Sequence, residues 1–281
     1  AAYAVKLLHE AGVPKEVVQL MAASGADIGA TLVPDLRIAG IVFTGSVEVA
    51  QTINRTLAAR SGPIVPFIAE TGGQNAMVVD SSALIEQAVD DIILSAFGSA
   101  GQRCSALRVL YVQEDIADAL LTLLKGAMEE LQLGDPHRLD TDIGPVIDAK
   151  AQAGLLAHIE RMKKEAKLVA VAPEPSAYDA SVVRPHAFEI PSIDMLKQEV
   201  FGPVLHIVRF RASELKTLPA KINATRFGLT FGLHSRIHEH MEFFATHIHA
   251  GNIYINRSMI GAVVGVQPFG GEGLSGTGPK A

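Results

Sequence analysis

The only cysteine of this 281-residue chain, Cys104, lies in the stretch FGSAGQRCSALRVLYV, residues 97–112. A thiolate attacks carbonyl carbon well, and the small residues before Cys104 would let a substrate approach the backbone closely. Arg103 and Arg108 are expected to favour the thiolate over the thiol. A lone cysteine is more often an unreactive, buried side chain, so these residues alone leave both interpretations open.

A carboxylate in a different stretch could complete such chemistry. Glu70 ends the apolar run PIVPFIAE, residues 63–70, and Gly72 and Gly73 follow it. Ligands bind at strand ends in open α/β sheets, and apolar neighbours would raise the pKa of a carboxyl placed there. Glu70 could then act as a general base. An exposed glutamate at a strand terminus is the alternative.

The stretch FTGSVEVA, residues 43–50, combines a strand, a glycine turn and a helix start. Backbone N–H groups at Thr44, Gly45 and Ser46 are expected to point outward beside the positive helix end, where a pyrophosphate could bind. An ordinary capped helix, with Ser46 as the N-cap, explains the same residues.

A turn in KQEVFGPVL, residues 197–205, offers groups that suit a nucleoside. Glu199 could accept hydrogen bonds from ribose hydroxyls, and Phe201 could pack against a flat ring. A turn with a solvated glutamate is the alternative.

Histidines are concentrated between residues 234 and 249: His234, His238, His240, His247 and His249. The spacing of His234 and His238 suits a metal pair on a helix, but the chain lacks HExxH and CxxC patterns. We therefore expect surface or packing histidines and no metal site.

Composition limits the remaining classes of function. Hydrophobic residues make up 48% of the chain and charged residues 19%, so a core can form. No run approaches the roughly 18 apolar residues of a membrane-spanning helix. The net charge of −6 argues against a nucleic-acid surface. A single cysteine fits a reducing cytoplasm, and both chain ends look like cuts through a larger chain.

Periodicity predicts alternating helices and strands, the pattern of an α/β protein with a parallel sheet. Helices are expected at 2–11, 47–59, 85–97, 116–131, 151–165 and 237–247, and strands at 39–45, 63–70, 75–80, 106–112, 168–172, 204–210 and 252–256. The glycine-rich tail, 261–281, is expected to be irregular.

The order of FTGS, ETGG, GQRC, EVFGP and QPFGGEGLSGTG resembles the aldehyde dehydrogenase superfamily along the whole chain. Within that superfamily, the sequence around Glu70 and Cys104 and in the tail resembles the L-glutamate γ-semialdehyde (1-pyrroline-5-carboxylate) dehydrogenase module of bifunctional proline utilization A. The resemblance implies the aldehyde dehydrogenase fold, a partial Rossmann-type cofactor domain plus an α/β catalytic domain. Residues 1–71 would end the NAD-binding domain, 72–257 would form the thiol domain, and 258–281 would be a returning tail that carries the substrate anchor.

The resemblance also implies a role for each matching residue. Cys104 would be the nucleophile and Glu70 the base that activates water. Cofactor contacts would come from Thr44, Gly45, Ser46, Glu199 and Phe201, and the substrate's α-carboxylate would be held by Ser105, Gly261 and Ala262.

The implied activity is NAD-dependent oxidation of L-glutamate γ-semialdehyde to L-glutamate in a cytoplasmic homo-oligomer, or one held peripherally at the inner membrane. FAD would belong to a separate proline dehydrogenase domain. The family's oxyanion asparagine and adenosine-ribose lysine precede the matching region, so this stretch alone is expected to be inactive. The alternatives are an aldehyde dehydrogenase with another substrate and a purely structural or interaction unit.

Overall fold

The computed structural model describes residues 1–175, 181–263 and 265–278, and the chain divides into two compact units. The first unit comprises Ala1–Phe43 and Glu48–Phe67, and the second comprises Thr44–Val47 and Ile68–Ala281. Residues 264 and 279–281 of the predicted tail lie outside the described residues.

The N-terminal elements include helices with little buried surface and two short strands. The elements are α1 (Ala2–Glu10), α2 (Gly25–Leu32), β1 (Ile41–Thr44), α3 (Val47–Ala58) and β2 (Phe67–Glu70). Helices α1 and α2 bury no residue, and α3 buries only Ala50. Ile41 N–H donates to the Pro66 carbonyl and Gly45 N–H to the Glu70 carbonyl, so paired positions advance together along both strands. This parallel pairing agrees with the predicted strand–helix–strand unit.

The second unit is organised around a mostly parallel sheet. Within the described ranges it has seven strands, in the order β10 (Asn252–Ile255), β9 (Thr230–His234), β3 (Ala76–Val79), β4 (Val109–Gln113), β7 (Val204–Phe210), β6 (His186–Glu189) and β5 (Lys167–Val171). All neighbouring strands pair in parallel except β5 and β6. The α/β fold class is therefore confirmed.

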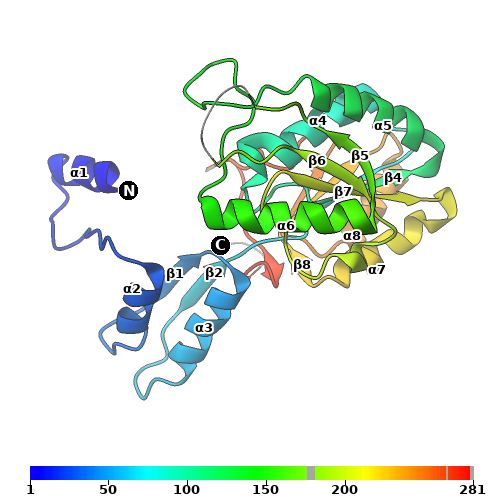
Figure 1. Ribbon diagram of the computed structural model, residues 1–281. Coiled ribbons are helices and arrows are strands. Elements are labelled where there is room, and N and C mark those ends of the chain that lie inside the picture. The colour runs from blue at the N-terminus through cyan, green and yellow to red at the C-terminus, as the bar shows by residue number, and fades with distance from the viewer. Residues whose placement is uncertain (176–180, 264, 279–281) are drawn as a thin grey trace. The chain divides into compact units, whose positions relative to one another are not determined.

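Helices pack against this sheet and complete the core. They are α4 (Ile85–Phe97), α5 (Glu114–Glu129), α6 (Ala149–Glu165), α7 (Leu218–Asn223) and α8 (His238–His247), with 3₁₀ turns η1 (Gly98–Gly101), η2 (Ile193–Met195) and η3 (Ala212–Thr217). Figure 1 shows α6 crossing in front of the strands. Every residue of β3 and β4 is buried, as expected for central parallel strands. No helix in the described part of the chain is long and apolar enough to cross a membrane.

Several predicted boundaries change. The strand expected at 63–70 begins only at Phe67, because Pro63 and Pro66 have no N–H to donate to a ladder. The strand expected at 106–112 begins at Val109, since the residues before it form the loop that follows Cys104. The tail is not wholly irregular: β11 (Glu272–Gly273) pairs antiparallel with β8 (Phe227–Gly228).

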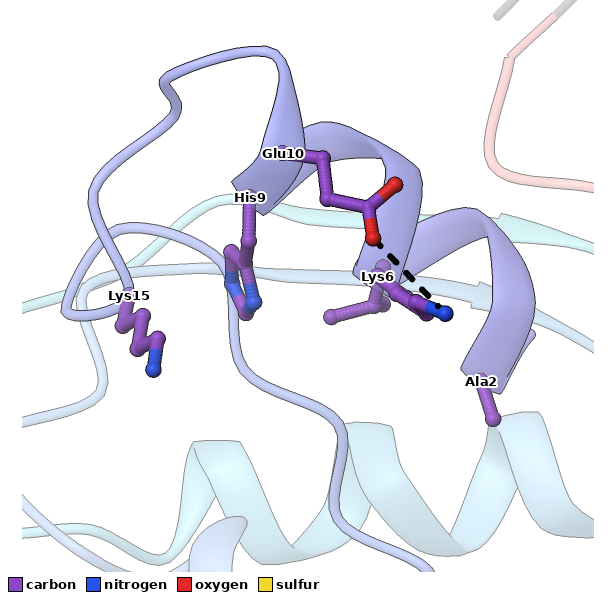
Figure 2. A pocket seen from close by; sticks show the side chains of 6 residues that line it. Ala2, Lys6, His9, Glu10 and Lys15 are labelled. Carbon is purple, nitrogen blue, oxygen red and sulfur yellow. Dashed lines mark ion pairs between the residues drawn. The ribbon is translucent and has the colours of Figure 1, made fainter.

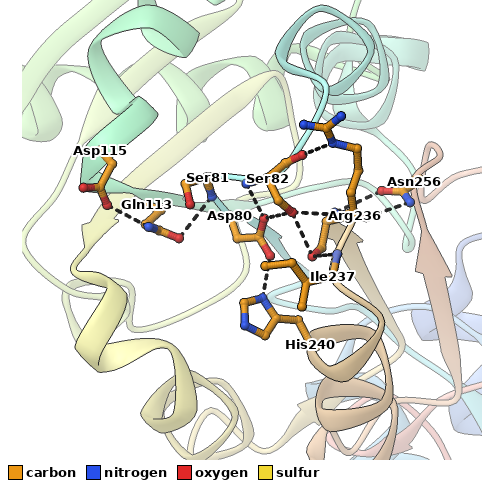
Figure 3. A network of polar contacts seen from close by, with 10 residues as sticks. Asp80, Ser81, Ser82, Gln113, Asp115, Arg236, Ile237, His240 and Asn256 are labelled. Carbon is orange, nitrogen blue, oxygen red and sulfur yellow. Dashed lines mark hydrogen bonds and ion pairs between the residues drawn. The ribbon is translucent and has the colours of Figure 1, made fainter.

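A buried polar network joins the carboxyl ends of the central strands (Figure 3). Asp80 follows β3 and is 1% exposed. Its carboxylate accepts hydrogen bonds from His240 Nδ1 at 2.7 Å and from the Ser82 backbone N–H at 2.8 Å. Burial alone would raise the pKa of Asp80, but the hydrogen bonds from His240, Ser235 and Ser82 together lower it.

Replacing Asp80 with asparagine is expected to lower the free energy of unfolding at neutral pH by about 1–3 kcal/mol, because charge-assisted hydrogen bonds are lost. The pKa of Asp80 is lowered in the folded state, so this stabilisation is lost as pH falls through that lowered value. Denaturant titration at neutral and acid pH measures both effects. The matched change at exposed Asp90 should have little effect, and equal losses at both positions would contradict the prediction.

Candidate active site

Cys104 follows a short segment of left-handed backbone conformation after the end of α4. Ser99, Ala100 and Gly101 have φ angles of 57°, 54° and 64°, in the left-handed region. At Gly101 a Cβ atom would meet the Gly202 carbonyl, so the two backbones touch there. Left-handed non-glycine residues are costly and are often found at functional sites.

Asn75 fixes the backbone around Cys104, a role that the sequence did not reveal. Its side-chain nitrogen donates to the carbonyls of Cys104 at 2.6 Å and Ala106 at 2.9 Å. Its oxygen accepts from the Thr230 N–H at 3.2 Å. The available signal was an amide residue directly before a fully buried strand, where each polar atom needs a partner.

The Cys104 thiol is half-buried and is held mainly in its neutral form. Burial raises its pKa, the Ser105 N–H lowers it, and the negative charges of Glu199 and Glu70 raise it further. Both carboxylates are therefore close enough to influence the thiol.

The prediction that Arg103 and Arg108 would make the thiolate the favoured form is wrong in its outcome, because the pKa of Cys104 is raised. Arg108 does interact favourably with the thiolate, since burial lowers the pKa of Arg108 and its Coulombic interaction with Cys104 acts to raise it. Burial and the two carboxylates outweigh this effect on the thiol. Arg103 turns away: its Nε donates to Ser99 Oγ at 3.0 Å. The Arg108 guanidinium contacts the Glu199 carboxylate at 3.3 Å. The hydrogen bonds of both guanidinium groups are thus made to groups other than the thiol.

Glu70 lies half-buried at the end of β2 and is held by the tail. Its Oε2 accepts the Gly271 N–H at 3.0 Å, while its buried Oε1 has no hydrogen-bond partner among the described residues. Burial raises the pKa of Glu70, and the Gly271 N–H partly offsets that rise. A carboxyl with a raised pKa and an unpartnered oxygen suits a general base better than a solvated surface glutamate.

The tail brackets Glu70 on both sides. The Thr71 N–H donates to the Ser275 carbonyl at 2.9 Å, and the Thr277 N–H donates to the Ala69 carbonyl at 3.0 Å. The glycine-rich tail therefore sets the position of the candidate base, although it is distant in sequence.

Glu199 and Phe201 occur on one turn and both contact Arg108. The Glu199 carboxylate lies against Gly72, where a Cβ atom would collide with it. The Phe201 side chain is 44% exposed, and the Arg108 guanidinium carbon is 5.2 Å from its ring centroid. An anchored carboxylate and an exposed aromatic ring fit a ribose and a flat base.

The predicted phosphate turn is exposed at Thr44, Gly45 and Ser46. Not every N–H group of this turn is left for a ligand, because Gly45 donates to the Glu70 carbonyl at 3.1 Å. This bond connects the turn directly to the backbone of the candidate base.

The predicted carboxylate anchor combines two segments. Ser105 is buried, whereas Gly261 is half-buried and Ala262 exposed. Arg103 Nη1 reaches the Ile260 carbonyl at 3.4 Å, which connects the Cys104 segment to the loop that carries Gly261.

The described residues contain no group of three or more His, Cys, Asp or Glu side chains that could hold a metal ion. His240 contacts Asp80 and His238 contacts Glu242. A separate open pocket of about 490 Å³ in the first unit is lined by Ala2, Val5, Lys6, His9, Glu10 and Lys15 (Figure 2). It shares no residue with the candidate active site.

The α/β fold agrees with the comparisons with known proteins. The model for the aldehyde dehydrogenase family matches residues 1–281, and the chain belongs to that family. It is 53% identical over 290 residues to the bifunctional protein PutA of Klebsiella aerogenes, covering 100% of this chain and 22% of that protein.

Solved structures give the same assignment. The crystal structure of a bifunctional proline utilization A protein is similar with a TM-score of 0.96 and 56% identity, covering 100% of this chain and 28% of that one. A Thermus 1-pyrroline-5-carboxylate dehydrogenase with bound NAD has a TM-score of 0.91 and 35% identity, covering 98% of this chain and 54% of that one. The chain thus spans only part of the length of each of these relatives.

Proposed function

We propose that this chain carries the thiol and hydrolytic groups of an NAD-dependent enzyme that oxidises L-glutamate γ-semialdehyde to L-glutamate in proline catabolism. The main support is electrostatic: both Glu70 and Glu199 act on the Cys104 thiol. The side chains that we propose as nucleophile, base and ribose-binding group therefore lie near one another. The names of the PutA and 1-pyrroline-5-carboxylate dehydrogenase relatives support the substrate.

In the first step, the Cys104 sulfur attacks the aldehyde carbon and forms a carbon–sulfur bond. The carbonyl oxygen becomes an alkoxide, which the Cys104 backbone N–H helps to stabilise. The thiol must first give its proton to water, because burial and the nearby carboxylates favour the protonated form. Loss of a hydride from the same carbon then gives a thioester on Cys104.

The residues of this chain fit one end of NAD⁺. We assign Glu199 to the nicotinamide ribose, Phe201 to the nicotinamide ring, and the turn Thr44–Gly45–Ser46 to the pyrophosphate. The anchored Glu199 carboxylate and the exposed Phe201 ring support this assignment. When bound, NAD⁺ supplies the hydride acceptor.

Glu70 then completes the reaction by removing a proton from water as that water attacks the thioester carbon. The carbon–sulfur bond breaks, L-glutamate leaves, and Cys104 is regenerated. Burial of Glu70 raises its pKa, which makes its carboxylate a stronger base near neutral pH.

We assign the substrate's α-carboxylate to Ser105, Gly261 and Ala262, since a glycine-containing loop offers open N–H groups. We further infer that residues 1–71 belong to the NAD-binding domain, 72–257 to the thiol domain and 258–281 to the returning tail. From the resemblance of the motifs, we also infer a cytoplasmic homo-oligomer with FAD in a separate proline dehydrogenase domain.

The decisive experiment compares aldehydes in the full-length protein by following NADH. We expect kcat/KM for L-glutamate γ-semialdehyde to exceed that for butanal by about 10²-fold or more, because a site built for a polar group rejects an analogue that lacks it. Equal values would favour an aldehyde dehydrogenase with another substrate. Absence of NADH with every aldehyde would reject the proposed chemistry.

A further inference from the structure

Arg108 is the largest fully buried side chain of the described residues, with 1% exposure. Its Nη1 donates to the carbonyls of Gly101 at 2.6 Å and Gly202 at 3.3 Å. Its Nη2 donates to the carbonyl of Arg103 at 3.0 Å and to the Glu199 carboxylate at 3.3 Å. One guanidinium therefore binds the loop before Cys104 and the loop that carries Glu199.

Burying the Arg108 guanidinium is energetically unfavourable unless the side chain does more than fill space. Burying a guanidinium costs several kcal/mol before its partners compensate, and Arg108 Nε has no hydrogen-bond partner among the described residues. The planar fork of arginine does supply something that an apolar side chain cannot, because it fixes several acceptors at set angles.

We propose that Arg108 is a positioning residue that locks the Cys104 loop to the Glu199–Gly202 turn and neutralises the Glu199 carboxylate beside the thiol. The proposal rests on the proposed function in assigning Glu199 to the cofactor side. It assigns no contact between Arg108 and substrate.

The close contact at Gly101 supports the geometric part. A side chain there would collide with the Gly202 carbonyl, so these two segments have no space between them. Arg108 binds the carbonyls of both residues. A change at Arg108 would therefore shift the thiol and the Glu199 turn relative to each other.

Charge supports the electrostatic part. Burial and the carboxylates of Glu199 and Glu70 raise the pKa of the Cys104 thiol, and the backbone N–H groups of Ser105 and Cys104 lower it. Arg108 also interacts directly with Cys104, because their Coulombic attraction opposes the lowering of the Arg108 pKa by burial. Arg108 is paired with Glu199, whose effect on the thiol is the larger of the two carboxylate effects. Removing the guanidinium would leave that carboxylate uncompensated, so the thiol pKa should rise further.

A second buried contact holds the backbone of Arg108 itself. The His206 N–H and Nδ1 lie 3.0 Å and 3.1 Å from the Arg108 carbonyl. His206 Nε2 is 2.9 Å from His158 Nε2. Burial lowers the pKa of His206 to about 3 and that of His158 to about 4, so this pair stays neutral during catalysis.

The test uses the full-length protein with the single variants Arg108→Met, Arg108→Lys and Glu199→Gln. It also uses two double variants, in which Glu199→Gln is combined with Arg108→Met or with Arg108→Lys. Peptide mass spectrometry follows alkylation of Cys104 by iodoacetamide against pH, and steady-state assays give kcat and the KM for NAD⁺. Arg209→Met is the matched control, because Arg209 is also an ion-paired arginine, bound to Glu189 and Asp118, but lies outside the site.

We expect Arg108→Met to slow alkylation near pH 8 by about tenfold and to shift its profile to higher pH. Adding Glu199→Gln should restore most of that rate. Arg108→Lys should raise the KM for NAD⁺ by about tenfold, as expected when a hydrogen bond to a charged group is lost, and this effect should nearly vanish in the Glu199→Gln background.

Unchanged alkylation in a folded Arg108→Met protein would overturn the proposal. If that variant does not fold, the Arg108→Lys variants decide. An equal rise in the KM for NAD⁺ when Arg108→Lys is made in the wild type and in the Glu199→Gln protein would also overturn the proposal. Failure of the wild type to produce NADH from the semialdehyde would instead reject the proposed function, while the alkylation profiles would still decide the role of Arg108.

Discussion

Replacing Cys104 with alanine is expected to lower NADH formation from L-glutamate γ-semialdehyde by about 10⁴-fold or more in the full-length protein, because the atom that forms the covalent bond is removed. Cys104 is half-buried, and its backbone carbonyl is held by Asn75 at 2.6 Å. The alanine chain keeps that hydrogen bond, so we expect it to fold and to bind NAD⁺ as the wild type does.

A serine variant provides the matched comparison for Cys104→Ala. Serine has nearly the same shape but is a much poorer nucleophile at neutral pH, so Cys104→Ser should be almost as inactive. A thermal unfolding scan and NAD⁺ titration establish that both variants are folded. Substantial NADH formation by the alanine variant would mean that Cys104 is a packing residue and would reject the thioester pathway.

Replacing Glu70 with glutamine is expected to separate the two halves of the reaction. Glutamine keeps an oxygen that can accept the Gly271 N–H, which lies 3.0 Å from the carboxylate, but it cannot take a proton from water. One equivalent of NADH should form rapidly, and turnover should then fall by about 10²–10⁴-fold. Mass spectrometry should find the glutamyl thioester on Cys104.

The pH profile gives the sign of the Glu70 effect. Burial raises the pKa of Glu70, and its basic form is the deprotonated one. Thioester hydrolysis by the wild type should therefore rise as pH increases through that raised pKa, and Glu70→Gln should lose this limb. The same change at exposed Glu86 is the control. A Glu70→Gln enzyme that hydrolyses its thioester at the normal rate would show that another group activates water.

Local patterns predicted the main scaffold well. The apolar spacing in α4 and the run that forms β7 gave the observed bounds, because helix period and a continuous apolar strand are properties of neighbouring residues. Strands β6 and β9 were missed. The first is only HAFE and the second, TFGLH, contains a central glycine, so neither has a strong strand pattern.

Sequence patterns supplied candidate residues for the site but not the contacts between them. Sequence patterns singled out Cys104, Glu70 and Glu199, and the structure brings these three together. The direction of Arg108 and the role of Asn75 were not predictable, because each depends on partners supplied by distant segments. Burial, which sets the pKa of the thiol, is likewise a property of the folded chain.

The hydrogen bond between Gly271 and Glu70 spans 201 positions of the chain. Glu70 and Cys104 are synthesised long before Gly271. A nascent chain that has not yet reached Gly271 therefore lacks the N–H group that holds the candidate base. Contacts of such long separation also form late in folding. The order of synthesis therefore makes the hydrolytic half of this site one of the last parts to be assembled, after the thiol and its loop have been made.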